Sequence, residues 1–374
     1  MNDRLFFQDK AVLVTGACGT VGRELIRQLL ENHAVKELIG IDNNESELFF
    51  LEQEFSGLGN TRFFLGDIRD YKKLLAKFRD MHIIFHTAAY KHVILCERSP
   101  FEAVQTNILG VHNVIAAARE AKVERLIFTS SDKAVNPTSV MGTSKLMGER
   151  LITAAHSNLR KDGTIFAATR FGNVLGSRGS VIPIFREQIR RGGPVTLTDP
   201  EMTRFIMSIQ EAVRLVIDSA MIAKGGEVFV TKMPVIRIKD LASVMIEELA
   251  PIYGHQPQSV AIEIIGFKPG EKIYEELMNH EEIRRTMELK RYFAVMPAFR
   301  SLYCNTDYVY PDTVKEMVDK PYNSANEIPL TVEELRGFIH QNNLLSEDAN
   351  QHFTPQDRYW PNDNCKSGES CLHN

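Results

Sequence analysis

The feature that most constrains the fold is an apolar run at residues 10–15 that leads directly into the stretch TGACGTVG. Glycines at these spacings permit a tight turn and let the backbone approach a ligand closely. Residues 21–30 follow with helical spacing, and a strand, a glycine-rich loop and a helix in this order open a βαβ unit. The helix N-terminus offers free N–H groups and a partial positive charge to a dinucleotide pyrophosphate. We therefore expect the loop to bind a dinucleotide through Gly16, Gly19, Thr20, Val21 and Gly22.

Four further apolar runs continue this pattern, at residues 37–42, 62–65, 82–86 and 125–130, with helical segments between them. The longest of these helical segments is 103–121. Regular alternation of strands and helices predicts an α/β fold, in which a parallel, doubly wound sheet of the Rossmann type carries helices on both faces.

The amino-acid composition changes near Phe171, where Gly, Pro and Arg become frequent. We expect a helix at 208–223 and a strand at 227–231 to return to the sheet, and further helices at 239–253 and 270–279. The second half then forms a smaller, C-terminal α/β substrate lobe over the edge of the sheet. The predicted division is a dinucleotide-binding domain at 1–172 with a return at about 205–235, an interleaved substrate lobe at 173–345, and a polar tail at 346–374.

Polar and small residues mark the carboxyl ends of the expected strands. Asp42 ends the second strand, about 20 residues after Gly22, where a carboxylate accepts hydrogen bonds from the adenosine ribose and repels a 2′-phosphate. Because no Arg follows Asp42 directly, we favour NAD over NADP. Asp67 is placed to reach the adenine, and Ala88 and Ala89 are small enough for a cofactor to pass close by. The same edge adds Asn43, Ile68, Lys91 and Asn107 to the expected cofactor site.

Composition and charge narrow the class of protein. The chain has 374 residues and a net charge of -4, which gives no indication of a nucleic-acid partner. No apolar run approaches the ~20 residues of a membrane span, and the N-terminal stretch lacks the features of a secretory signal, so we expect a cytoplasmic protein. The five cysteines are sparse and unpaired in spacing, which fits a reducing compartment. Cys365, Cys371 and His373 lie in the polar tail, where we expect disorder rather than a metal site.

Four motifs together, GACGTVG, HTAAYKHV, TSSDKAVNP and MGTSK, resemble those of the extended short-chain dehydrogenase/reductase superfamily. More narrowly, the chain resembles the nucleotide-sugar 4,6-dehydratases that act on UDP-N-acetylglucosamine in bacterial surface-glycan synthesis, from about residue 8 to about residue 340. The superfamily has a catalytic tyrosine four residues before the lysine of MGTSK, whereas this chain has Met141 before Lys145. Part of the subfamily also carries methionine there, so Met141 departs from the superfamily and agrees with the subfamily.

The resemblance implies a reaction in three steps, namely oxidation of sugar C4, loss of water across C5–C6, and reduction of C6. It assigns Asp132 as the acid for the departing C6 hydroxyl and Lys133 as the base at C5. The C4 base stays open: Ser131 is placed to hydrogen-bond the C4 hydroxyl, with Asp132 or a relayed water as the proton acceptor. Lys145 would bind the nicotinamide ribose, and Met141 would fill space beside the sugar.

The second half supplies cations and polar groups for a UDP-sugar. By resemblance, Asn173 and the backbone near Val181 hold the diphosphate, Arg204 pairs with phosphate, and Glu271 binds the nucleoside ribose. Relatives of this fold often pair through helices near 103–121 and 142–156, which implies a homo-oligomer. Further substrate candidates are Arg178, Lys268, Lys272 and Lys91, the last of which is placed to reach either the sugar or the cofactor.

Two other functions stay open. A nucleotide-sugar 4-epimerase would need an efficient acid–base group at C4, normally the tyrosine, and would not need the pair Asp132 and Lys133. A non-enzymatic, NAD-binding regulatory protein would account for the missing tyrosine but not for the substrate loops. The sequence also leaves open whether the nucleotide is UDP or GDP, and whether C5 keeps its configuration.

Overall fold

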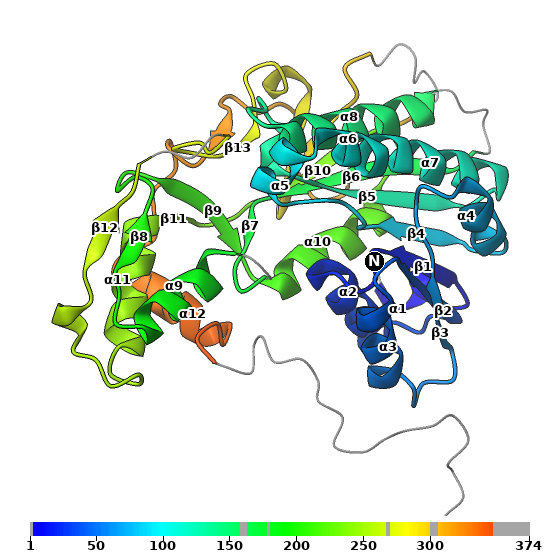
Figure 1. Cartoon of the computed structure of the whole chain (residues 1–374). Helices are drawn as coiled ribbons and strands as arrows, with labels where there is room; N and C mark the ends of the chain where they lie inside the picture. The colour runs from blue at the N-terminus through cyan, green and yellow to red at the C-terminus, as the bar shows by residue number, and fades with distance from the viewer. Residues whose placement is uncertain (1–2, 158–162, 178–179, 267–269, 300–305, 347–374) are drawn as a thin grey trace, which may run out of the picture.

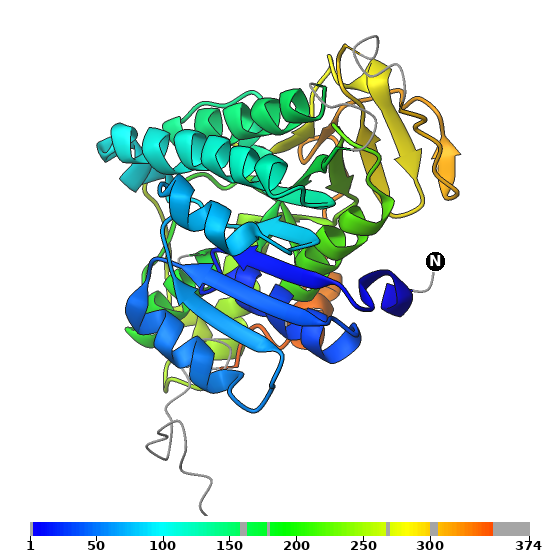
Figure 2. The ribbon, with the colours of Figure 1, turned by 90° about the vertical axis from the view of Figure 1, so that its right-hand side faces the viewer.

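The computed structural model describes residues 3–157, 163–177, 180–266, 270–299 and 306–346. A ten-stranded sheet forms the main body, and a smaller lobe of short strands and helices lies beside it (Figure 1). Figure 2 shows the molecule turned, with helices on both faces of the sheet. The fold is therefore the Rossmann-like α/β architecture with a smaller lobe that the sequence predicts.

Seven parallel strands make up most of the large sheet, in the order β3-β2-β1-β4-β5-β6-β10. The strand that enters the glycine loop is buried along its whole length between two neighbours, as expected of a central parallel strand. The five strands expected in the first half are confirmed, each to within one residue, and the expected strand at 227–231 is β10. The bounds are β1 (Ala11–Thr15), β2 (Glu37–Asp42), β3 (Thr61–Leu65), β4 (Ile83–His86), β5 (Arg125–Ser131), β6 (Ile165–Phe171) and β10 (Val228–Thr231).

Helices cover both faces of this sheet (Figure 1). On one face lie α4 (Tyr71–Phe78), α7 (Val111–Glu120) and α8 (Val140–Ser157), and on the other α2 (Thr20–Asn32) and α10 (Ile209–Ile222). The helices expected at 21–30 and 208–223 are thus confirmed. The segment expected at 103–121 is helical throughout, and it is built from α6 (Pro100–Val104), the π-helix η1 (Gln105–Gly110) and α7. The remaining elements of this half are α1 (Asp3–Phe7), α3 (Glu45–Glu54), α5 (Val93–Arg98) and the 3-10 turn η2 (Asp132–Ala134).

Three antiparallel strands extend the large sheet beyond β10. β15 (Tyr292–Val295) pairs with β10, β14 (Thr286–Leu289) with β15, and β16 (Thr313–Lys315) with β14. These residues fall within the range 173–345 that the sequence-based division gives to the substrate lobe. The chain therefore returns from the lobe to the main body twice: first at α10 and β10, and again at β14, β15 and β16.

The smaller lobe has its own hydrophobic core. One small sheet has the order β11-β9-β7 and a second pairs β12 with β8. Apolar side chains of three helices close over these strands, including Ile182, Phe185, Leu241 and Leu335. The bounds are β7 (Asn173–Val174), β8 (Val195–Leu197), β9 (Thr203–Met207), β11 (Val235–Arg237), β12 (Ile262–Ile264), α9 (Val181–Arg190), α11 (Ile238–Leu249), α12 (Val332–Gln341) and the 3-10 turn η3 (Pro257–Ser259).

The helix expected at 239–253 is α11, but the helix expected at 270–279 is wrong. The chain there turns at Gly270, whose φ is +80°, and then forms the short strand β13 (Glu276–Met278). β13 pairs with β17 (Tyr322–Asn323), and the 3-10 turn η4 (Ile283–Arg285) follows it. Pairing with a strand more than 40 residues away along the chain overrides the local helical pattern.

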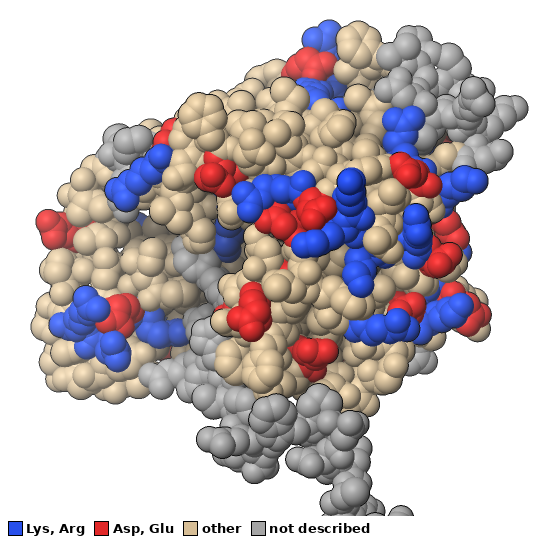
Figure 3. All heavy atoms as spheres, turned by 45° about the vertical axis from the view of Figure 1, so that its right-hand side comes forward, with Lys and Arg blue, Asp and Glu red and all other residues tan. Residues whose placement is uncertain are grey.

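Charged side chains of both signs are interspersed over the face drawn in Figure 3. This pattern indicates local ion pairs on that face rather than a field of one sign. Among the helices of the described ranges, none combines the length and the apolar character needed to cross a membrane.

Arg170 on β6 ties three parts of the chain together in the interior. It is only 1% exposed, and its guanidinium donates to the Glu149 carboxylate on α8 at 2.6 and 3.0 Å. It also donates to Glu282, which lies just before η4, at 3.0 and 3.1 Å, and to the Leu277 carbonyl at 2.8 Å. A buried guanidinium that satisfies two carboxylates fixes α8 and the β13 segment against the sheet.

Arg170→Ala should lower the free energy of unfolding by about 3–5 kcal/mol, because it leaves two buried carboxylates without their cation. Urea unfolding followed by circular dichroism measures this change. The control is Arg191→Ala, which removes an exposed arginine that pairs with Glu187, and it should leave the midpoint unchanged. If Arg170→Ala loses no more unfolding free energy than the control, the structural role assigned to Arg170 and its two carboxylate partners is contradicted.

Candidate active site

The glycine loop is closed to side chains at two positions. Gly16 has a φ of +73°, and a Cβ there would lie 2.6 Å from the Ala88 backbone nitrogen. A Cβ on Gly22 would lie 2.1 Å from the Gly16 carbonyl oxygen. α2 then begins at Thr20, and its N-cap residue Gly19 contributes no side-chain hydrogen bond. The free N–H groups of this helix end are therefore presented to an anion, which is the arrangement that holds a dinucleotide pyrophosphate.

Two carboxylates mark the ends of β2 and β3. Asp42 accepts hydrogen bonds from the backbone N–H groups of Cys18 and Asn44, both at 3.0 Å, which fixes its carboxylate beside the glycine loop. Asp67 is paired with Arg69 at 2.7 Å, and Asn43 donates to it at 3.5 Å. The neighbouring Ile68 is buried against Gly110 of η1. The expected adenosine side thus consists of oriented acceptors at the edge of the sheet.

A cavity of about 730 Å³ opens between the glycine loop and the ends of β4 and β5. A second cavity, of about 630 Å³, is lined by the smaller lobe together with part of the main body. Lys133, Asn173, Ser180 and His92 line both cavities, so these side chains mark the place where the two spaces meet. Predicted residues that line the first cavity are Gly19, Thr20, Val21, Gly22, Ala89, Lys91, Ser131, Asp132, Lys133, Met141 and Lys145.

The predicted acid–base residues come together directly after β5. Ser131 Oγ donates to Asp132 Oδ1 at 2.5 Å and accepts the Lys133 backbone N–H at 3.2 Å. Lys133 Nζ donates to both Asp132 oxygens, at 3.0 and 3.2 Å. Asp132 is only 1% exposed, whereas the Lys133 side chain retains some access to the cavities. The three residues form one hydrogen-bonded unit at the meeting point of the two cavities.

The charges of this unit stabilise one another. Burial by itself would raise the pKa of Asp132, but the Lys133 ammonium and the hydrogen bonds from Ser131 and Lys133 outweigh it, and the pKa is lowered. Burial would likewise lower the pKa of Lys133, but Asp132 and Glu275 outweigh it, and the pKa is raised. In the protein without ligands, Asp132 is therefore an ionised carboxylate and Lys133 an ammonium.

Met141 and Lys145 lie one turn apart on α8. Met141 is 3% exposed and packs with Cys96 and Ala103 while it lines the first cavity. Lys145 Nζ donates to the Thr129 carbonyl at 2.9 Å, and burial lowers its pKa to about 8, against the opposing effect of Glu149. The Met141 thioether has no proton to exchange, so its contribution is to shape the wall.

Two predicted cofactor residues have different surroundings. Asn107, in η1, accepts the Tyr90 N–H at 2.8 Å and donates to the Tyr90 carbonyl and Ser144 Oγ, both at 2.9 Å. This amide clamps the loop after β4 onto α8, so it supports the cavity wall from behind. Lys91 is exposed on that loop and lines the first cavity.

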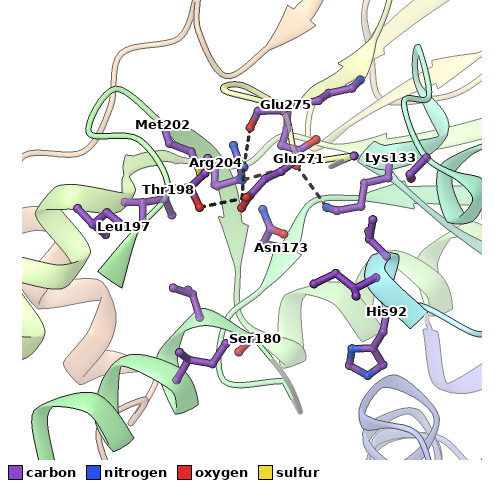
Figure 4. Close-up of a pocket in the computed structure, with 18 of the residues that line it drawn as sticks. His92, Lys133, Asn173, Ser180, Leu197, Thr198, Met202, Arg204, Glu271 and Glu275 are labelled. Carbon is purple, nitrogen blue, oxygen red and sulfur yellow. Dashed lines mark hydrogen bonds and ion pairs between the residues drawn. The ribbon is translucent and has the colours of Figure 1, made fainter. Parts of the chain in front are cut away.

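The predicted substrate residues surround the second cavity (Figure 4). Asn173 and Val181, the first residue of α9, line it from one side. Glu271 lines it from another side and accepts a hydrogen bond from Thr198 Oγ1 at 3.0 Å. Lys272 also lines it, with Nζ donating to the Val135 carbonyl at 2.8 Å. Arg178 and Lys268 lie outside the described residues.

Arg204 lines the second cavity, but its guanidinium is already largely hydrogen-bonded. It donates to the carbonyls of Thr203, Ile273 and Lys272 at 2.7, 3.0 and 2.7 Å. These bonds hold the segment after Gly270 against β9. Arg204 thus supports the cavity wall. Its positive charge also acts on a neighbouring carboxylate, Glu275, whose Oε1 lies 3.5 Å from Arg204 Nε.

Three residues at the site were missed by the sequence reasoning. Glu275 is 2% exposed and lies 3.4 Å from Lys133 Nζ and 3.5 Å from Arg204 Nε. Ser180, the N-cap of α9, has a buried Oγ for which no partner is found among the described residues. His92 lies where the cavities meet, and burial lowers its pKa. Their contacts form only when the smaller lobe packs against the main body, so the local sequence does not predict them. The polar loop before Glu275 was the one local indication of a site there.

The sheet, the closed glycine loop and the Ser-Asp-Lys unit on the end of β5 define the chain as an extended short-chain dehydrogenase/reductase. Residues 12–297 match the family described as "Polysaccharide biosynthesis protein". The chain belongs to this family, whose match covers well over half of its length.

Relatives with assigned names include both dehydratases and epimerases. The chain is 51% identical over 292 residues to a protein of Methanocaldococcus jannaschii described as an uncharacterized membrane protein, covering 78% of this chain and 87% of that protein. It is 36% identical to a UDP-N-acetylglucosamine 4,6-dehydratase (inverting) of Campylobacter jejuni, covering 81% and 87%. It is also 36% identical to a UDP-glucose 4-epimerase of Rickettsia bellii, covering 91% and 98%.

Solved structures share the fold. The X-ray structure of Pen from Bacillus thuringiensis matches with a TM-score of 0.84 at 42% identity, over 91% of this chain and all of that one. DesIV of Streptomyces venezuelae, a dTDP-glucose 4,6-dehydratase solved with NAD and TYD bound, matches with a TM-score of 0.62 at 23% identity, over 70% and 86%. The second match shows a common fold, in which that protein holds a nicotinamide dinucleotide.

Gly22→Ala should abolish tight retention of a nicotinamide dinucleotide, because the new methyl group would displace the Gly16 carbonyl and open the loop. We expect binding at least about 10-fold weaker, measured by titration calorimetry with NAD. Gly337→Ala is the control, since nothing lies within 4 Å of a Cβ there. Equal affinities of the two folded variants would contradict the assignment of the loop.

Lys145→Met should change how stability depends on pH in the protein without cofactor. The pKa of Lys145 falls from 10.5 to about 8 on folding, so the unfolded chain binds this proton more tightly than the folded one. This lysine therefore destabilises the native protein fully below pH 8, and the effect disappears as the pH rises towards 10.5. The stability difference between variant and native protein should shrink by about 2 kcal/mol between pH 7 and pH 10, measured by urea unfolding. A difference independent of pH would contradict a buried lysine with a lowered pKa.

Proposed function

We propose that the chain is an NAD-dependent nucleotide-sugar 4,6-dehydratase that converts UDP-N-acetylglucosamine, or a related nucleoside-diphosphate N-acetylhexosamine, into the 4-keto-6-deoxy sugar. The observation that carries this proposal is the ion pair between buried Asp132 and partly exposed Lys133 at the meeting point of the two cavities. Elimination of water across two adjacent carbons needs an acid and a base that reach both carbons at once. The named Campylobacter jejuni dehydratase among the relatives supports the same reaction.

The residues present fit a nicotinamide adenine dinucleotide. When bound, the nicotinamide would take a hydride from sugar C4 and return it to C6. The glycine loop and the start of α2 would hold the pyrophosphate, and Asp42 and Lys145 would hold the two ribose groups. NAD is favoured over NADP because Asp42 repels a 2′-phosphate, and because Arg69, at the end of the neighbouring strand, is paired with Asp67.

The chain's own residues would move the protons. Asp132 is ionised, which suits it to accept the C4 hydroxyl proton next to the Ser131 hydroxyl. It would then give this proton to the C6 hydroxyl, which leaves as water. Lys133, as a neutral amine, would take the proton from C5 and return it to C5 after the double bond is reduced. The C4 hydroxyl proton thus ends in the released water, and the other protons are restored.

The second cavity is suited to the nucleotide. The N-terminus of α9, with the Ser180 hydroxyl and the Asn173 amide, provides donors for a diphosphate. Glu271 would accept hydrogen bonds from the nucleoside ribose. Lys91, which lines the first cavity, would reach the sugar from there. Apolar side chains such as Leu197 and Met202 line the same space and would contact the base (Figure 4).

The proposal also includes a homo-oligomer. Helices α5, α6 and α8 pack together, and α6 and α8 present Phe101 and Met147 with exposures of 83% and 45%. Large apolar side chains gathered on neighbouring helices favour burial against another chain.

A nucleotide-sugar 4-epimerase is the second candidate, because the named Rickettsia bellii relative matches this chain over nearly its full length. Incubation with UDP-N-acetylglucosamine in deuterated water, without added cofactor, separates the two. A dehydratase gives a product lighter by one water that carries deuterium, seen by mass spectrometry, whereas an epimerase gives an isomer of unchanged mass, which chromatography resolves from the substrate. An unchanged substrate in the presence of confirmed bound NAD would direct the same assay to GDP-sugars.

Asp132→Asn should reduce turnover by about 100-fold or more, because an amide neither takes up the C4 proton nor transfers a proton to the C6 hydroxyl. The same mass-spectrometric assay measures the rate. Asp319→Asn, which changes an exposed aspartate paired with Lys315, is the control and should turn over normally. Normal turnover by Asp132→Asn would remove this residue from the mechanism.

A further inference from the structure

Glu275 is a buried carboxylate at the acid–base site to which the proposed reaction gives no part. It lies just before β13, and its backbone is fixed by two hydrogen bonds with Ser324, both at 2.9 Å. Its Oε1 lies 3.4 Å from Lys133 Nζ and 3.5 Å from Arg204 Nε. Figure 4 shows its side chain reaching between these two cations. A carboxylate held this firmly, and this close to a predicted base, is positioned to control that base.

The second oxygen of Glu275 is available to take up a proton. Oε2 is buried and accepts no hydrogen bond from the residues that the structure describes. The Asp132 and Glu275 carboxyl groups lie close enough for each to shift the pKa of the other. Two carboxyl groups can share a hydrogen bond only if one of them carries a proton, since an ionised carboxylate has no donor. A proton on Glu275 would satisfy both groups.

The charges around Glu275 come from three parts of the chain. η2 contributes Asp132 and Lys133, and β9 contributes Arg204; Glu271 and Lys272 precede Glu275 in its own segment, and Ser324, which follows β17, is uncharged. Burial raises the pKa of Glu275 and Asp132 raises it further, against Lys133 and Arg204. Glu275 is therefore the carboxyl group of the cluster that takes up a proton most readily.

The proposed reaction needs such an acceptor. Lys133 is an ammonium in the protein without ligands, yet it must be a neutral amine before it can take the C5 proton. Asp132 has to stay ionised to accept the C4 proton, and an arginine does not release its protons in proteins. Within the described cluster, Glu275 is left as the group in contact with Lys133 that can take the ammonium proton.

We propose that Glu275 accepts the proton that Lys133 gives up before the C5 step and holds it in a hydrogen bond to Asp132 during turnover. This inference rests on the proposed dehydratase function. An N–H bond of the ammonium breaks and an O–H bond forms on Glu275, so the net charge of the cluster is unchanged. Lys133 then takes the C5 proton and returns it, while Asp132 carries the C4 proton to the departing water. Glu275 contacts no reacting atom in this sequence, so it is a positioning residue.

Glu275→Gln keeps the shape and the donor towards Asp132 but removes the ability to accept a proton. We expect kcat at pH 7 to fall about 100-fold with KM within about threefold. The deficit should narrow as the pH rises, because Lys133 can then lose its proton to solvent. Glu276→Gln is the matched control: this neighbour accepts from Asn136 at 3.0 Å and lies 3.7 Å from Lys272, and its variant should behave as the native enzyme. A deficit that is constant with pH, a wild-type kcat, or a change confined to KM would overturn the inference.

A titration without substrate tests the shared proton by itself. In protein labelled with 13C at the glutamate δ-carbons, the resonance that disappears in Glu275→Gln should titrate at a higher pH than those of exposed glutamates. If it titrates together with them, the inference fails even when the native enzyme is an active dehydratase. If it titrates high while the native enzyme leaves every nucleotide sugar unchanged, the proposed function fails and the shared proton stands.

Discussion

A cluster of four charged side chains, three of them buried, joins the main body to the smaller lobe. Asp132 and Lys133 come from the end of β5, Arg204 from β9, and Glu275 from the segment before β13. A buried charge without partners is strongly destabilising, so each of these groups requires the others to be in place. The cluster therefore fixes how the lobe sits on the sheet, and it places the meeting point of the two cavities on Lys133. Geometry needed for stability and geometry needed for chemistry coincide here.

The first half of the molecule could be predicted because its signals are local. The glycine loop follows β1 directly, and Asp132 and Lys133 follow β5 directly, so their place at the carboxyl edge depends only on recognising two parallel strands. The glycine spacing predicts a tight turn at Gly16 and Gly22. The structure agrees, because a methyl group at either position would clash with backbone atoms. The position of Asp42 could also be predicted locally, because it follows from the end of a strand and the turn after it.

The second half was predicted less well because its contacts are made across long separations in sequence. Residues 270–279 have helical spacing, but β13 pairs with β17, and the Ser324 that follows β17 holds the Glu275 backbone. Neither partner can be inferred from the local sequence, and so Glu275 was missed. Arg204 shows the same difficulty in another form. The expected pairing of Arg204 with phosphate stays a prediction, and the structure adds the bonds from its guanidinium to three backbone carbonyls. The residue type was informative about location, but its partners depended on the fold.

The methionine at position 141 explains why the proposed reaction would use three acid–base groups, Asp132, Lys133 and Glu275, side by side. In the tyrosine-bearing relatives that the motif resembles, a phenol takes the C4 proton, whereas the Met141 thioether only packs with Cys96 and Ala103. In the proposed dehydratase reaction, the C4 proton would then go to Asp132, whose pKa is lowered by the Lys133 ammonium. An Asp132 committed to the C4 proton cannot also neutralise Lys133, and an ammonium cannot act as a base. A second carboxyl group is needed to separate these two tasks, and Glu275, buried at 3.4 Å from the same ammonium, stands where that group has to be.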